Sequence, residues 1–222
     1  MNINKLRKIG AYVYMPLIFT ILGFAIVYFL FAPLINIGVS VANMVIADHV
    51  YNFQDNDSSV YKQSSALSGT ISSSEIEFPK YGDHYANLSC ERIGLDVKVY
   101  WGDTPTILKK GPGHDIRSML PGFGSPILLS AHNTTHFYPL KDVKEGDIIK
   151  YSTSYGEYLY RVTGTKVANE NDIDATRLRS NEEVLVMYTC YPFEVLTVRK
   201  TERFFVYAQR ISGPDVSYME GE

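Results

Sequence analysis

Hydrophobic and polar residues follow different patterns in the two parts of this chain. Residues 9–47 contain no charged side chain, and apolar residues are densest between residues 11 and 37. That stretch is longer than the ~20 apolar residues with which a helix crosses a bilayer. The pattern therefore predicts a single N-terminal transmembrane helix, with residues 9–47 forming the anchor and its extension.

Charges on either side of this segment predict its orientation. Three basic residues lie within residues 1–8, whereas the first charged residue after the segment, Asp48, is acidic. Because positively charged flanks stay on the cytoplasmic side of a membrane, we expect residues 1–8 in the cytoplasm and the rest of the chain outside the cell. A cleaved signal peptide is the alternative, since Ser40-Val41-Ala42 resembles a cleavage site, although its apolar region would be shorter.

Hydrophobic periodicity is lost in residues 48–80, which are rich in Ser, Asn, Asp and Gln. A stretch of this composition buries too little apolar surface to offset the entropy lost on ordering. We therefore expect residues 48–80 to be a polar extracellular spacer that holds the folded part, residues 81–222, away from the membrane.

Residues 81–222 contain short apolar runs separated by Gly, Pro, Asn and Asp, a pattern typical of β-strands. The predicted strands cover residues 87–93, 96–100, 125–131, 147–153, 157–168, 183–189 and 203–211. Short helices are predicted at residues 104–110 and 139–143. The runs 127–129 and 184–187 are continuously apolar, as expected of central strands covered on both faces. A mostly-β fold with many short strands favours a closed barrel or a sandwich.

Composition narrows the class of protein further. The formal net charge of −3 over 222 residues is near neutral and evenly spread, which argues against nucleic-acid binding. The two cysteines, Cys90 and Cys190, are too few for the disulfide framework of a small secreted domain, so packing must hold the core. No Cys/His spacing indicates a zinc site. Glu170, Asp172 and Asp174 are interpreted as turn formers rather than calcium ligands.

Three predicted strands each carry one reactive side chain at an end. Cys190 follows the apolar run 184–189, His132 follows the run 127–131, and Arg203 begins the last strand. If the last two strands pair as a hairpin, the thiol and the guanidinium come to the same end of the sheet. A histidine can activate a thiol near neutral pH, and a fixed cation can stabilise the oxyanion that forms when sulfur attacks a carbonyl. The three groups suffice for acyl transfer through a thioester.

Each of these residues also has a plainer interpretation. A cysteine at a strand end is more often a small buried hydrophobe, a histidine there is more often structural, and an arginine is usually solvated. A Cys90–Cys190 disulfide, formed in the oxidising exterior, would indicate a non-catalytic surface β domain; otherwise Cys90 packs as a small side chain. Arg199 is a second candidate for the arginine, although it falls on a predicted loop. His114, in a Gly/Pro turn, is expected to be structural or exposed.

The order and spacing of these residues resemble the sortase family. Thr189-Cys190 at the end of an apolar strand, Arg203 at the start of the next and Ala131-His132 at the end of an earlier one are similar to the sortase signature. Supporting segments are found at residues 111–114, 120–122, 130–132 and 140–147. The resemblance covers residues 80–212, and Cys190-Tyr191-Pro192-Phe193 is similar to the stretch after the nucleophile in class D sortases.

This resemblance implies an eight-stranded sortase-like β-barrel on the outer face of the membrane of a Gram-positive bacterium. It implies that Cys190 attacks a Leu-Pro-x-Thr-Gly-like sorting signal at the C-terminus of a secreted protein and forms a thioester. His132 would protonate the leaving amine and then activate an amine of peptidoglycan or of its lipid-linked precursor. Arg203 would bind the substrate backbone or the oxyanion. No organic cofactor and no metal are implied.

Residues beside the three catalytic candidates are the candidate substrate contacts. They are Thr189, Ala131, Tyr191 and His136. One departure from the family pattern concerns the threonine that sortases usually have four positions before the nucleophile, where this chain has Val186. Valine keeps a shape that suits a strand but lacks the hydroxyl, so a substrate contact carried by that hydroxyl is not expected here.

The subclass follows from features outside the signature. No second hydrophobic segment occurs between the last predicted strand and Glu222, and pilin-polymerising class C sortases often carry one. A housekeeping or class D anchoring role is therefore favoured over the class C alternative. A related cysteine hydrolase, which releases its product to water, is a further alternative.

Overall fold

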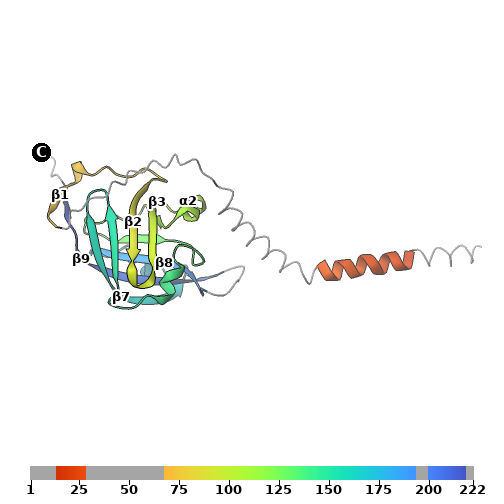
Figure 1. Cartoon of the computed structure of the whole chain (residues 1–222). Helices are drawn as coiled ribbons and strands as arrows, with labels where there is room; N and C mark the ends of the chain where they lie inside the picture. Colours follow the sequence, from red (N-terminus) through yellow and green to blue (C-terminus); the bar gives the residue numbers. More distant parts are fainter. Residues whose placement is uncertain (1–13, 29–67, 194–199, 219–222) are drawn as a thin grey trace, which may run out of the picture. The chain divides into compact units, whose positions relative to one another are not determined.

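The computed structural model of this protein describes residues 14–28, 68–193 and 200–218. The chain divides into two compact units, residues 1–54 and 55–222. Within the first unit, residues 14–28 form an α-helix, drawn in red in Figure 1. None of the described helices is both long enough and apolar enough to traverse a bilayer. Residues 1–8 lie outside the described ranges. The predicted anchor, residues 9–47, also lies outside them except for residues 14–28.

Eight strands of the second unit close into a barrel (Figure 1). Their order around the barrel is β2 (His84–Cys90), β3 (Leu95–Trp101), β4 (Gly113–His114), β5 (Ile127–Ser130), β8 (Val184–Tyr191), β9 (Glu202–Ser212), β7 (Glu157–Asn169) and β6 (Ile148–Thr153). The barrel closes because β6 pairs with β2. Neighbouring strands are antiparallel except for the pairs β3–β4 and β5–β8, which are parallel. The predicted mostly-β fold with an eight-stranded barrel is confirmed.

Short helical turns connect the strands near the predicted positions. The helix α2 (Pro105–Lys110) begins at a proline, whose fixed φ suits the first turn of a helix, and ends at Gly111. The second predicted helix is a 3₁₀ turn, η3 (Tyr138–Asp142). Further 3₁₀ turns are η1 (Ser73–Glu75), η2 (Glu91–Ile93) and η4 (Ile173–Thr176). The strand β4 was not predicted, because two residues are too few to show a hydrophobic period.

The folded domain begins earlier in the chain than the sequence predicts. The strand β1 (Thr70–Ser72) pairs in parallel with β10 (Asp215–Ser217), and Ile76 is buried in the barrel core. These residues fall within 48–80, the range predicted to be spacer. The pairing with β10 satisfies their backbone hydrogen bonds, and a Ser-rich sequence gives no sign of such a distant partner. The boundary predicted between residues 80 and 81 is therefore corrected to a position before β1.

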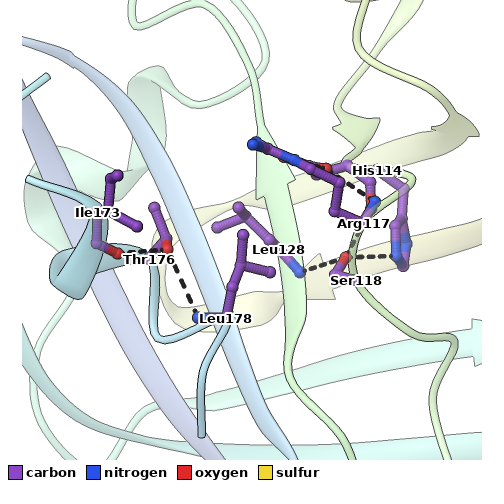
Figure 2. A network of polar contacts seen from close by, with 8 residues as sticks. His114, Arg117, Ser118, Leu128, Ile173, Thr176 and Leu178 are labelled. Atoms are coloured by element: carbon purple, nitrogen blue, oxygen red, sulfur yellow. Dashed lines mark hydrogen bonds and ion pairs between the residues drawn. The ribbon is translucent and has the colours of Figure 1, made fainter. Parts of the chain in front are cut away.

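Alternate residues of the central strands contribute to two different apolar layers. On β8, Leu185 and Met187 lie in the barrel core, whereas Val184 and Val186 lie in a second cluster on the outer side of the barrel. This outer cluster consists of Leu128, Ala168, Ala175, Val184, Val186, Phe205 and Tyr207. Leu178, in the loop after η4, packs against the outer cluster, and Figure 2 shows it beside Leu128. The loop covers this face, which explains why the run 184–187 is continuously apolar.

A buried polar network surrounds His114 on β4. Its Nδ1 atom contacts the Tyr85 hydroxyl, which in turn contacts the hydroxyl of Tyr151. Its Nε2 atom lies 2.8 Å from the Ser118 hydroxyl, a contact drawn in Figure 2. His114 is fully buried, so its predicted structural role is confirmed and the alternative that it is exposed is wrong.

The hydrogen bonds of Ser118 assign the proton on His114. The single hydroxyl proton of Ser118 is donated to the carbonyl of Asp115 at 2.8 Å, and the same oxygen accepts the Leu128 N–H at 3.0 Å. The imidazole must therefore donate from Nε2 to Ser118, which leaves Nδ1 to accept from Tyr85. Burial lowers the pKa of His114 to about 3, so the folded protein keeps this ring neutral.

We expect His114 to make the domain less stable in acid. Its pKa is about 3 in the folded protein and 6.5 in the reference state, so the unfolded chain takes up the proton first as the pH falls. The stabilisation is complete above pH 6.5 and decreases below it by up to about 1.4 kcal/mol per pH unit. Urea unfolding at about pH 7.5 and about pH 5.5 should show a smaller acid loss for His114→Gln than for the wild type, and equal losses would contradict this account.

Candidate active site

Three strand ends bring the predicted catalytic residues to one edge of the sheet. On β8 and β9, which are antiparallel, Cys190 lies directly opposite Arg203. On β5 and β8, which are parallel, pairing continues past the end of β5, because the Ala131 N–H donates to the Tyr188 carbonyl at 3.3 Å. The same register, continued by one more residue, places His132 level with Cys190. The sheet therefore sets Cys190 beside Arg203, and the register extended past the end of β5 brings His132 to the same level.

These three side chains also share one face of the barrel. Along β8, Val186 lies in the outer cluster, and alternation places Cys190 on the same side. Along β9, Phe205 lies in the outer cluster, and alternation places Arg203 with it. Past the end of β5, Ala131 lies in the barrel core, so we infer that His132, the next residue, lies on the opposite, outer side. All three residues are half-buried, so a substrate can reach them. Within the described ranges, no hydrogen bond or ion pair joins any two of the three.

The thiol of Cys190 is free, and so is that of Cys90. Cys90 is buried in the barrel core at the end of β2, whereas Cys190 lies on the outer face of β8. The strands β3, β4 and β5 separate β2 from β8 around the barrel. The alternative of a Cys90–Cys190 disulfide is therefore wrong, and the prediction that Cys90 packs as a small side chain is confirmed.

The surroundings of His132 favour the neutral imidazole. Burial lowers its pKa below the usual 6.5, and electrostatic interactions with His136 and Lys109 lower it further. His136 is held near by its Nε2 atom, which lies 3.3 Å from the Lys109 carbonyl at the end of α2. A neutral imidazole can accept a proton from a thiol or an amine. His136 thus lies near His132, and its contact with substrate stays a prediction.

The guanidinium of Arg203 is held by three acceptors. Its Nη1 atom donates to the carbonyl oxygens of Lys200 at 2.7 Å and Glu202 at 2.9 Å, and its Nη2 atom donates to the Glu170 carboxylate at 2.7 Å. A guanidinium has five N–H donors, so two donors remain for a substrate within the part of the chain that the structure describes. The rival candidate Arg199 lies outside the described residues.

Thr189 and Ala131 form a buried contact with each other. The Thr189 hydroxyl donates to the Ala131 carbonyl at 2.7 Å, and both residues are almost fully enclosed. This bond holds the end of β8 against the segment that carries His132. Tyr191 is half-buried and stacks on Phe204, with ring centroids 6.4 Å apart. The contacts of these residues with substrate stay predictions.

The valine that replaces the usual sortase threonine suits its surroundings. Val186 is fully buried within the outer cluster of apolar side chains. A hydroxyl at this depth would need a hydrogen-bond partner, and burying it without one is unfavourable. The departure from the family pattern is thus matched by the packing around it.

The acidic residues after β7 bind cations of the protein itself. Glu170 pairs with Arg203, and Asp172 pairs with Lys166 at 2.9 Å. Asp172 also accepts the Ala175 N–H at 3.2 Å at the start of η4. Among the residues described, no three His, Cys, Asp or Glu side chains gather as metal ligands would. This agrees with interpreting these acids as turn formers.

Two polar residues near the site were not singled out from the sequence. Asn133 and Lys200 both donate to the carbonyl oxygen of Pro192, at 3.0 and 2.7 Å. Asn133 follows His132 directly in the sequence. Its position next to the histidine was the one available signal, because loop residues show no periodicity that reveals their partners.

Comparison with known proteins decides the family. The sortase family model, described as "Sortase domain", matches residues 88–211, more than half of the chain. This protein belongs to the sortase family. The match includes β5, β8 and β9, the strands that carry the three predicted catalytic residues, and it confirms the resemblance found in the sequence.

Individual sortases are similar over the barrel. Sortase D of Bacillus subtilis (strain 168) is 29% identical over 134 residues, which cover 60% of this chain and 67% of that protein. The solved Sortase D5 transpeptidase of Clostridium perfringens is 25% identical with a TM-score of 0.55, covering 62% of this chain and 85% of that chain. Sortase C from Clostridium perfringens SM101 is 27% identical with a TM-score of 0.53, covering 60% and 72%. This sortase is thus similar to members of both classes D and C.

We predict that removing the positive charge of Lys109 raises the pKa of His132. The charge of Lys109 is one cause of the lowered pKa, and Lys109 is exposed, so salt should weaken the effect. An NMR titration of the His132 ring in Lys109→Met should give a higher pKa than in the wild type at low salt. Lys110→Met is the matched control, because Lys110 is not among the groups that shift this pKa. Identical titrations of Lys109→Met and the wild type would refute the assignment.

Proposed function

We propose that this sortase is a cysteine transpeptidase that joins secreted proteins to the cell wall. The observation that carries the proposal is the register of β8 and β9, which sets Cys190 opposite Arg203 on the face that also bears His132. The free thiol of Cys190 is half-buried on that face. A thiol, an imidazole and a guanidinium in this arrangement suit acyl transfer.

The proposed reaction has two steps. The sulfur of Cys190 bonds to the carbonyl carbon before the glycine of a Leu-Pro-x-Thr-Gly-like sorting signal, and the carbon–nitrogen bond breaks. His132 takes the thiol proton of Cys190 and gives it to the leaving amine, and Arg203 stabilises the oxyanion with its unused N–H donors. In the second step an amine of peptidoglycan or of its lipid-linked precursor attacks the thioester and gives its proton to His132. The new amide forms and the thiol is restored.

The relatives support this reaction class and the class D assignment. The Clostridium perfringens relative is itself described as a transpeptidase, and the Bacillus subtilis relative is a Sortase D. Similarity to a sortase C at 27% identity supports the second candidate, a pilin-polymerising class C sortase.

We further propose that the protein is anchored in the cell membrane by a single pass, with its barrel outside the cell. The charge-free residues 9–47 would provide the anchor, and the basic residues within 1–8 would stay in the cytoplasm. In this orientation the barrel meets its proposed substrates, which are secreted proteins of a Gram-positive bacterium and the amines of its cell wall. Protease treatment of intact cells that lack a cell wall should remove the barrel and leave residues 1–8 protected.

Cys190→Ala should abolish cleavage of a Leu-Pro-x-Thr-Gly peptide by the full-length protein while leaving the fold intact. The thiol is the proposed nucleophile, and its half-buried position on the outer face makes the alanine tolerable for packing. Cys90→Ala is the matched control, because it removes the other thiol from the core and should retain cleavage. Chromatographic assay of the peptide measures both variants, and undiminished cleavage by Cys190→Ala would rule out the mechanism.

Added amine separates a transpeptidase from a hydrolase. If the thioester is passed to an amine, a peptide-like amine nucleophile should give the amide product and increase the turnover. A hydrolase would release the free acid at the same rate with or without the amine. Mass spectrometry of the products distinguishes these outcomes, and exclusive formation of the acid at high amine concentration would favour the hydrolase.

A further inference from the structure

A single carbonyl oxygen connects the segments around the candidate active site. Pro192 lies two positions after Cys190, and its carbonyl accepts a hydrogen bond from the side-chain amide of Asn133 at 3.0 Å. Asn133 is the residue after His132, and only 5% of it is exposed. The bond therefore runs from the segment that carries the histidine to the segment that carries the cysteine.

The same carbonyl also binds the segment that carries Arg203. The ammonium of Lys200 donates to Pro192 at 2.7 Å, and the carbonyl of Lys200 accepts from the Arg203 guanidinium, also at 2.7 Å. We call Asn133, Pro192 and Lys200 the polar tie. Through Lys200, the polar tie extends to Arg203, whose other nitrogen is bound to Glu170.

Strand pairing cannot hold these segments in place by itself. The strand β5 ends at Ser130, β8 ends at Tyr191 and β9 begins at Glu202, so Asn133, Pro192 and Lys200 all lie outside the ladder. A buried amide must find a partner, and a carbonyl oxygen accepts two hydrogen bonds. In the polar tie both requirements are met by one shared atom, which fixes three loop segments relative to one another.

We propose that Asn133 and Lys200 are positioning residues for transpeptidation and act through the carbonyl of Pro192. Neither side chain has to touch the reacting atoms. Their effect is to hold His132 and Arg203 at the level of Cys190, where misplacement by about 1 Å can cost about 100-fold in rate. This inference rests on the proposed function, because it assigns residues that align the proposed catalytic groups.

Kinetics of Asn133→Ala and Lys200→Met in the full-length protein test this inference. Each variant keeps one donor to Pro192, so we expect kcat for peptide cleavage to fall about 10-fold, with KM changed less than about 2-fold. The double variant leaves the carbonyl without either donor. Its loss in kcat should exceed the product of the two single losses, because the two residues share one acceptor.

Two further measurements separate positioning from a merely structural role. The rate at which Cys190 reacts with a small thiol reagent should stay within about 2-fold of the wild type, since that reaction has no leaving amine for His132 to protonate and no oxyanion for Arg203 to stabilise. Lys200→Arg, which retains a cationic donor, should recover most of the lost kcat. Lys166→Met is the matched control, because it removes a lysine whose contact is with Asp172 and should leave kcat unchanged.

The outcomes decide between the inference and the proposed function. If the wild type cleaves the peptide, and both Lys200→Met and Asn133→Ala cleave it as fast as the wild type does, the polar tie has no positioning role. A fall in kcat that is matched by an equal change in the reactivity of Cys190, or that Lys200→Arg fails to restore, also overturns the inference. If the wild type cleaves no sorting peptide, the proposed function fails and the inference falls with it.

Discussion

Pairing of β8 with β5 on one side and with β9 on the other determines whether Cys190 has catalytic partners. A slip of one residue in β8 would turn Cys190 towards the barrel core. The same slip would exchange Met187 of the barrel core with Val186 of the outer cluster, and the difference in size between these buried side chains opposes it. The buried bond from Thr189 to the Ala131 carbonyl fixes the same register at the strand end.

Neighbouring charges and hydrogen bonds affect His132 and Arg203 in different ways. Burial, together with electrostatic interactions with His136 and Lys109, lowers the pKa of His132, which favours the proton-accepting form of the ring. Arg203 instead pairs with the Glu170 carboxylate through its Nη2 atom, and its Nη1 atom donates to two carbonyl oxygens. Because both acceptors and carboxylate orient the guanidinium before substrate arrives, little ordering remains for the reaction step. The barrel thus supplies a proton acceptor and a fixed cation on one face.

The sequence revealed the parts of this protein that depend on hydrophobic periodicity. The strands that end near His132 and Cys190 are continuous apolar runs, and reactive residues at their ends stand out against that pattern. The strand β4 is too short to show a period, and β1 depends on a partner far along the chain. The same reasoning explains why the burial of His114 was left open, since a Gly/Pro turn does not show which face it presents.

Contacts between loops could not be predicted from the sequence, for a different physical reason. Asn133 and Lys200 both donate to the carbonyl of Pro192. Every residue has a backbone carbonyl, so the sequence does not show which one accepts these bonds. The partnership of Glu170 with Arg203 likewise depends on the register of β7 against β9, which pairs Asn169 with Glu202. A polar loop residue is compatible with a solvated surface or with a specific partner, and only the fold distinguishes the two.

Convergence of three strand ends on one sulfur atom is the central claim, and trapping the acyl-enzyme tests it most directly. Full-length protein incubated with a Leu-Pro-x-Thr-Gly peptide in the absence of added amine is analysed by intact-mass and fragment mass spectrometry. The account predicts a mass increase equal to the acyl part of the peptide, located on Cys190 and released by an added amine. An acyl group on another residue, or cleavage of the peptide with no acyl group on Cys190, would contradict it.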